Sequence, residues 1–160
     1  MSKETIISSI LVTALIIAAV FLIKKTQIRA ALFAVLAAQA FSWPFSIMLV
    51  YTNAAEYPVR LFANATDNSF ILSYLLFPTV FALYYLHYPR VASINRQLIF
   101  SALICGGTVL LHVLLERYTN LIKYQNFSWY WNLLTYLISF YTLRKYVEWF
   151  FNSVFSKTIC

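Results

Sequence analysis

The chain has 160 residues, of which 62% are hydrophobic and 11% are charged, and its mean hydropathy is +0.73. A water-soluble domain of this size needs many more polar residues to cover its surface, so this composition excludes an ordinary soluble fold. Twelve Lys and Arg against five Asp and Glu give a net charge of +7. The Lys and Arg residues are dispersed along the chain instead of forming a basic stripe, which argues against nucleic acid as a partner.

Five apolar stretches follow one another along the chain, and each is close to the ~17 to 25 residues that an α-helix needs to cross a bilayer. Lipid offers the backbone no hydrogen bonds, and the alternating pattern typical of a β-barrel is missing from the sequence, so each stretch is expected to be helical. The fold class is therefore all-α, a polytopic transmembrane helical bundle that forms a single domain over residues 1–160. The expected spans are residues 5–23, 30–51, 69–87, 97–115 and 127–143, with an outer loop at 52–68 and an amphipathic carboxyl-terminal tail at 144–160.

The basic residues between the spans predict how the bundle sits in the membrane. Short cytoplasmic loops are enriched in Lys and Arg, and alternate gaps of this chain hold eight basic residues on one side and four on the other. With the acidic residues included, the first side carries +7 and the second side zero. The amino terminus is therefore expected outside the cell and the carboxyl terminus in the cytoplasm, where the basic rim meets anionic lipid headgroups. The eight residues are Lys24, Lys25, Arg29, Arg90, Arg96, Arg144, Lys145 and Lys157.

Small and polar residues within the spans predict how the helices pack. Alanines recur at three-to-four spacing over residues 30–38, and the pair Gly106-Gly107 lies in the fourth span. Both features are typical of helices that a neighbouring backbone approaches closely. Gln39 is expected to make an interhelical hydrogen bond, and Pro44 is expected to kink its helix.

The cysteines give no support for metal or redox chemistry. Cys105 lies inside a span and Cys160 ends the sequence, and no paired Cys or Cys/His spacing accompanies them. With two glycines in all, the chain also lacks a phosphate-binding or dinucleotide-binding loop. No metal and no cofactor is therefore expected.

Polar side chains near the predicted outer boundary form the candidate functional site, because ionisable groups beside a membrane span are costly unless they are paired. Two interpretations stay open. In the first, these residues form a polar cluster at the mouth of an outward-facing cavity. In the second, Arg60 pairs with Glu116 as a structural clasp that locks the long loop onto the bundle, and His112 bonds a carbonyl group. The candidates are Glu56, Arg60, His112, Glu116, Arg117 and Asn132.

These features predict a non-enzymatic membrane component that binds a partner or a small ligand at the outer polar cluster, with the lipid bilayer around it. A protein partner or a homo-oligomer is left open. One alternative is a small membrane-embedded enzyme in which His112 and Glu116, one helical turn apart, transfer protons. Another is a transporter or channel subunit. A water-accessible cavity touching both His112 and Glu116 would favour a functional site over a clasp.

Several short motifs occur in order along the chain. They are residues 56–62 (EYPVRLF), 86–89 (LHYP), 116–124 (ERYTNLIKY) and 129–131 (WYW). With them the sequence resembles a family of small integral membrane proteins from spore-forming Bacillus- and Clostridium-type bacteria that has no assigned activity. The resemblance implies a multi-pass protein of the bacterial plasma membrane, or of the spore membrane, and it transfers no catalytic residue.

Overall fold

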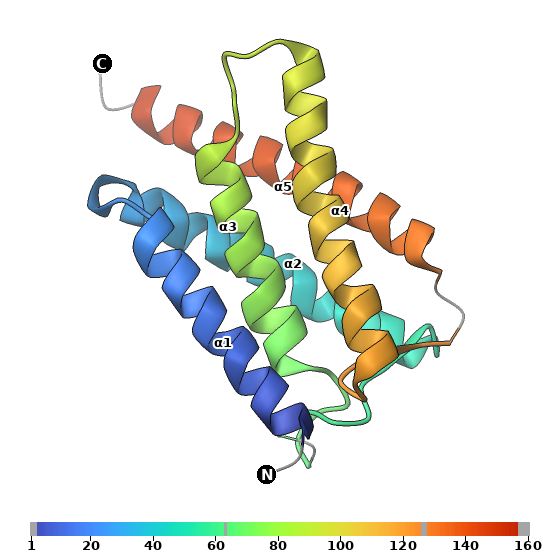
Figure 1. The fold of residues 1–160 in the computed structure, drawn as a ribbon. Helices are drawn as coiled ribbons and strands as arrows, with labels where there is room; N and C mark the ends of the chain where they lie inside the picture. Colours follow the sequence, from blue (N-terminus) through green and yellow to red (C-terminus); the bar gives the residue numbers. More distant parts are fainter. Residues whose placement is uncertain (1–2, 63, 126–127, 157–160) are drawn as a thin grey trace.

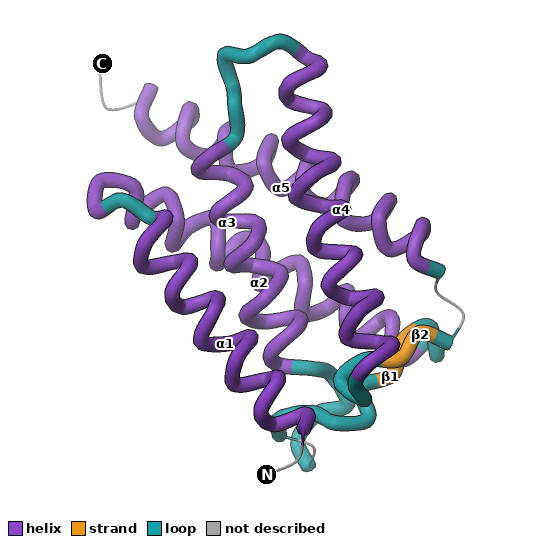
Figure 2. Tube along the Cα trace, in the orientation of Figure 1, coloured by secondary structure: helices purple, strands orange, loops and turns teal. Residues whose placement is uncertain are grey.

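The computed structural model describes residues 3–62, 64–125 and 128–156, and these form a bundle of five α-helices (Figure 1). Lys157 and Cys160, which the sequence analysis considers, lie outside the described residues. A short antiparallel pair of two-residue strands, which the sequence did not predict, joins two of the connections (Figure 2). The elements are α1 (Lys3–Leu22), the 3-10 turn η1 (Lys25–Gln27), α2 (Ile28–Tyr51), β1 (Ala55–Glu56), the π-helical segment η2 (Phe70–Leu76), α3 (Phe77–His87), α4 (Ile94–Tyr118), β2 (Lys123–Tyr124) and α5 (Trp129–Ser156).

Four helical segments are long and apolar enough to cross a membrane. They are α1, η1 with α2, η2 with α3, and α4, and they match the first four predicted spans to within a few residues at each end. The prediction of an all-helical membrane protein is confirmed at this level. A fifth crossing and the orientation of the bundle stay predictions.

The fifth predicted span lies in a helix that is longer and more polar than expected. α5 runs without interruption from Trp129 to Ser156, so the division at residue 143 between a span and a separate tail is not visible as a break. The sequence 129–156 contains neither Gly nor Pro, and nothing in it stops the helix at the charged residues Arg144 and Lys145. Those charges and Asn132 make α5 less apolar than a typical span, and it is not among the four segments that are apolar enough to cross a membrane.

The connections gather at two ends of the bundle. One end holds the start of α1 and the segments 52–62, 64–69 and 119–125, and we call it the strand end because β1 and β2 lie there (Figure 2). The other end holds the segments 23–27 and 88–93 and the last turns of α5, and we call it the arginine end (Figure 1). This grouping is the one that the predicted outer and cytoplasmic sides require.

α3 occupies the centre of the bundle (Figure 1), and its aromatic side chains form most of the core. Phe81 is fully buried and its ring lies 5.3 Å from that of Phe140 on α5. Ala34 and Ala38 on α2 are also fully buried in this core, as the alanine stripe predicts. α1 lies at the edge, with Glu4 as its only buried residue among those described.

A π-helical turn changes which backbone groups of the third span are satisfied. The Phe77 amide donates to the Leu72 carbonyl, five residues back, so the next carbonyl in this register, that of Ser73, faces Pro78, which has no N–H. In the ordinary α-helical register Pro78 also leaves the Tyr74 carbonyl without a donor.

Two side chains of α2 supply the missing donors. Ser42 Oγ donates to the Ser73 carbonyl at 2.7 Å, and Gln39 Nε2 donates to the Tyr74 carbonyl at 3.2 Å. The predicted interhelical hydrogen bond of Gln39 is therefore confirmed. α2 itself continues through Pro44 without a break.

The prediction that Gly106 and Gly107 allow a close helix contact is wrong within this chain. A Cβ atom added at either glycine would meet nothing within 4 Å, and Gly107 is exposed. The small residues that do permit close packing are the alanines of α2, because α2 lies directly against α3.

Candidate functional site

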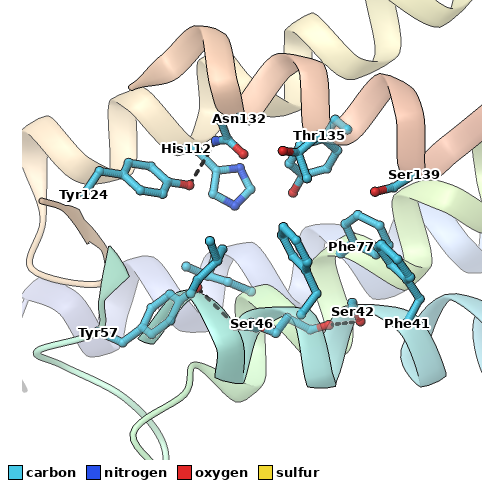
Figure 3. A pocket seen from close by; sticks show the side chains of 15 residues that line it. Phe41, Ser42, Ser46, Tyr57, Phe77, His112, Tyr124, Asn132, Thr135 and Ser139 are labelled. Carbon is cyan, nitrogen blue, oxygen red and sulfur yellow. Dashed lines mark hydrogen bonds between the residues drawn. The ribbon is translucent and has the colours of Figure 1, made fainter. Parts of the chain in front are cut away.

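His112 and Asn132, two of the six predicted site residues, line one cavity of the bundle (Figure 3). His112 lies on α4 with 5% of its surface exposed, and its Nδ1 is 2.9 Å from the carbonyl oxygen of Thr108. A carbonyl can only accept, so Nδ1 carries the hydrogen and Nε2 of the neutral ring is an acceptor. The hydrogen bond to a carbonyl that the clasp interpretation expects is thus present, yet the ring also faces the cavity.

Asn132 is held on the same side of the cavity by the connection between α4 and α5. Its Nδ2 donates to the hydroxyl of Tyr124 at 2.9 Å, which orients the amide so that its oxygen points away from Tyr124 in Figure 3. Thr135 and Ser139 follow on the same face of α5, three and seven residues further along. Together they form a polar stripe on an otherwise apolar helix face.

The opposite side of the cavity is a network of hydroxyl groups. Ser46 on α2 hydrogen bonds with the hydroxyl of Tyr57 at 3.2 Å and with that of Ser73 at 2.7 Å. It also donates to the Oδ1 of Asn68, which accepts a second hydrogen bond from Ser73 at 3.0 Å. Figure 3 shows Ser42 and Ser46 facing His112 and Thr135 across the cavity.

The lining is neutral throughout and rich in hydrogen-bonding groups. The cavity leaves about 60 Å³ for the centres of water-sized molecules. One water needs about 10–15 Å³ of such space, so the cavity has room for a ligand group of a few non-hydrogen atoms. Apolar rings and side chains complete the walls. The lining residues are Phe41, Ser42, Phe45, Ser46, Leu49, Tyr57, Leu72, Ser73, Phe77, His112, Tyr124, Asn132, Thr135, Tyr136 and Ser139.

Tyr57 and Tyr124, the tyrosines that line the cavity from the strand end, stay protonated at neutral pH. Burial raises the pKa of the Tyr57 hydroxyl, while hydrogen bonding with Ser46 and Ser73 opposes that change. Burial also raises the pKa of Tyr124, and Tyr57 and Glu116 add to it. Both hydroxyls therefore keep their hydrogen at neutral pH and leave the cavity lining uncharged.

The charged members of the predicted cluster lie elsewhere. Arg60 pairs with Asp67 at 2.6 Å within its own loop, and Glu116 accepts from the backbone amide of Tyr124 at 3.2 Å. The predicted Arg60–Glu116 clasp is therefore wrong. Arg117 is exposed, and neither it nor Glu116 lines the cavity.

The long loop is instead attached to the bundle through its backbone. β1 pairs with β2, so that Ala55 lies opposite Tyr124 and Glu56 lies opposite Lys123. The Val59 amide adds a hydrogen bond to the Asn120 carbonyl at 3.0 Å, and Glu56 accepts from Gln125 Nε2 at 3.0 Å. Strand pairing satisfies backbone groups of both connections and attaches the loop to the bundle without the expected clasp.

Sequence reasoning missed the serines and tyrosines of the cavity. A signal for them exists: Ser42 and Ser46 are four residues apart on α2, and Asn132, Thr135 and Ser139 follow a three-to-four spacing on α5. This spacing puts each set on one helix face. A search for ionisable side chains does not find this pattern, because the cavity is lined by neutral groups.

Within residues 3–62, 64–125 and 128–156, no three His, Cys, Asp or Glu side chains gather as metal ligands would. Comparison of the chain with protein-family models, with curated proteins and with solved structures found no match. The resemblance to the family from spore-forming bacteria stays a prediction from the motifs. The fold and the site define the class of protein as a helical membrane protein with a neutral polar cavity inside the bundle.

Proposed function

We propose that this protein is an integral membrane protein that binds the uncharged polar end of a molecule dissolved in the bilayer, without transforming it. The observation that carries the proposal is the cavity at His112 and Asn132, whose described lining is hydrogen-bonding but uncharged. The proposal keeps the function expected from the sequence and moves it from the charged cluster to the neutral cavity. The charge pattern and the motif resemblance support a bacterial plasma membrane or spore membrane, with the strand end outside.

The chemistry of the lining selects the ligand class. His112 Nε2 accepts a hydrogen bond, and the hydroxyl of Ser139 can donate or accept. The Thr135 hydroxyl donates to the Trp131 carbonyl at 2.9 Å, so it serves a ligand as an acceptor. A hydroxyl or amide group would find partners for its donor and its acceptor. A charged group would lose its hydration without meeting an opposite charge, at a cost of several kcal/mol.

The position of the cavity supports entry from the side. Phe41 on α2 is 37% exposed and Thr135 on α5 is half-buried, so the cavity reaches the bundle surface between these two helices. The surface next to it is apolar: Met48, seven residues after Phe41 on the same face of α2, is 57% exposed, and Ile138 on α5 is 58% exposed. In a bilayer this surface faces hydrocarbon, and an acyl chain could stay there while the polar end occupies the cavity.

The enzymatic alternative has weaker support. Glu116 faces the β2 backbone and is absent from the cavity lining, so proton transfer between His112 and Glu116 lacks a common space. The transporter or channel alternative would require a polar path along the bundle. The cavity is small and its described lining stays near the strand half of the bundle.

The test uses the full chain in a neutral detergent and two probes that differ at one position. 1,2-Dioctanoylglycerol carries a free hydroxyl, and its 3-acetyl ester does not. We expect the free hydroxyl to bind about fivefold more tightly, because one net hydrogen bond contributes ~1 kcal/mol. Native mass spectrometry measures both complexes.

His87 provides a matched control. Like His112 it bonds the carbonyl four residues back, Leu83 O at 2.9 Å, but it lies at the end of α3 and is exposed. His112→Leu should abolish the preference for the free hydroxyl, and His87→Leu should retain it. Equal binding of the two probes to the unmodified protein would refute the proposal.

A further inference from the structure

A second and larger cavity lies at the arginine end, and the proposed function does not use it. It is an open space of about 700 Å³ between the start of α2, the end of α3 and α5. Its lining contrasts with the first cavity because it is charged. The residues are Thr26, Gln27, Ala30, Tyr85, Leu86, Tyr88, Arg90, Gln97, Arg144, Lys145, Glu148, Phe151 and Asn152.

Three cations in this cavity share one carboxylate. Glu148 Oε1 lies 3.3 Å from Arg90 Nε and 3.1 Å from an Arg144 terminal nitrogen, and its Oε2 lies 3.9 Å from Lys145 Nζ. One negative charge among three positive ones leaves a surplus of two. Such a surplus attracts an anion, and it persists at physiological salt where groups are partly buried.

Arg144 is the buried member of the group. Its side chain is 8% exposed, and its guanidinium lies over the ring of Tyr88, 4.1 Å from the ring centre. The Nε–H is buried with no acceptor among the described residues. The hydrogen-bonding capacity of the guanidinium thus exceeds what Glu148 supplies, and a buried donor without an acceptor is costly.

The connection between α3 and α4 holds the second arginine in position. Arg90 donates to the Tyr85 carbonyl at 3.1 Å and lies over the Tyr85 ring at 4.7 Å. The side-chain nitrogen Nε2 of Gln97 donates to the Arg90 carbonyl at 3.2 Å and to the Ala92 carbonyl at 2.9 Å. The side-chain oxygen Oε1 of Gln97 accepts from the Tyr88 hydroxyl at 3.0 Å. The arginine is therefore placed by a fixed backbone turn.

We propose that this cavity binds a phosphate-bearing anion through Arg90, Arg144 and Lys145. Guanidinium groups match the geometry of phosphate oxygens and bind them through charge-assisted hydrogen bonds. A phosphodiester carries one negative charge and would halve the surplus of two, whereas a phosphomonoester carries ~1.5–2 and would nearly cancel it. The phosphate can belong to an anionic lipid headgroup, since the arginine end lies where the apolar spans end and headgroups begin, or it can belong to a free phosphorylated solute.

The test measures binding to the full chain in neutral detergent with three probes. Dihexanoylphosphatidylglycerol represents the lipid source, glycerol 1-phosphate the free source, and dihexanoylphosphatidylcholine is the zwitterionic control. Binding of the first alone assigns a lipid headgroup, and binding of the second at least as tightly assigns a free phosphate. If neither binds more tightly than the choline lipid, the proposal fails.

Variants separate binding from folding. Arg90→Gln should weaken the affinity for the phosphate-bearing probe about tenfold, because one charge-assisted hydrogen bond is lost. Arg117→Gln at the strand end should leave this affinity unchanged. Glu148→Gln removes the competing carboxylate and should tighten binding severalfold. A purely structural ion cluster predicts the reverse for Glu148→Gln: a lower unfolding temperature and no gain in binding, which would overturn the proposal.

Discussion

Ser42 offers a sharp test of how α2 holds the third span. Its hydroxyl donates to the Ser73 carbonyl at 2.7 Å, a group that Pro78 leaves without a backbone donor. Ser42→Ala removes this donor inside the bundle, where Ser42 is 5% exposed. A buried unsatisfied group costs ~1–3 kcal/mol, and hydrogen bonds within membrane bundles sit at the low end of such values. We expect a loss of about 1 kcal/mol.

Restoring a backbone donor should recover part of this loss. Pro78→Ala supplies an N–H that can reach a carbonyl of the preceding turn, so the double variant should lose less than the two single variants together. We expect a coupling of about 1 kcal/mol, as is typical of residues that share a partner. The assay is unfolding of the detergent-solubilised chain by titration with sodium dodecyl sulfate, followed by tryptophan fluorescence.

The control is Ser9→Ala. Ser9 is an exposed serine of α1. Its hydroxyl donates to a carbonyl of its own helix, Thr5 O at 2.9 Å, and does not link α1 to another helix among the described residues. Its substitution should change the unfolding free energy by less than about 0.5 kcal/mol. Strictly additive effects of Ser42→Ala and Pro78→Ala would refute the idea that Ser42 compensates for the proline.

Three further predictions concern packing and pH. Gly107→Ala should leave stability unchanged or raise it by up to about 1 kcal/mol in the same titration, because the added Cβ meets nothing within 4 Å; a large loss would reveal a contact outside this chain. Ala38→Leu, at a fully buried position against α3, should cost about 1–3 kcal/mol by overpacking, and an unchanged midpoint would contradict the packing. The raised pKa of Tyr124 means that the unfolded chain loses this proton first, so stability should be retained below pH ~10 and fall above it. Tyr124→Phe should flatten this alkaline decline, whereas Tyr118→Phe, at a residue that is 71% exposed, should not; equal slopes for both variants would exclude Tyr124 as the cause.

Parts of the candidate site were accessible from the sequence and parts were not. His112 and Asn132 stand out as polar residues in apolar stretches, and the structure brings them to one cavity. The ion-pair partner of Arg60 could not be predicted from the sequence, because Asp67 and Glu116 are both carboxylates expected near the same end of the bundle. The loop conformation decides between them, since Arg60 also donates to the Tyr57 and Thr66 carbonyls of its own loop at 2.9 and 2.7 Å.

The class of protein and the order of its helices follow from local sequence. Apolar stretches of membrane-spanning length must form helices, since lipid leaves the backbone no other hydrogen-bond partners. These stretches appear as α1, α2, the η2–α3 unit and α4. Local spacing also predicted the buried face of α2 at Ala34 and Ala38.

Which polar groups meet depends instead on the three-dimensional packing of the helices. The cavity joins Ser46 of α2, Tyr57 of the long loop, His112 of α4 and Asn132 of α5, and no local pattern links positions so far apart. At the arginine end, Glu148 meets Arg90 across 58 residues of sequence. Such contacts depend on how the helices are placed against one another, and that placement follows from side-chain packing, which the hydropathy of a single helix does not encode.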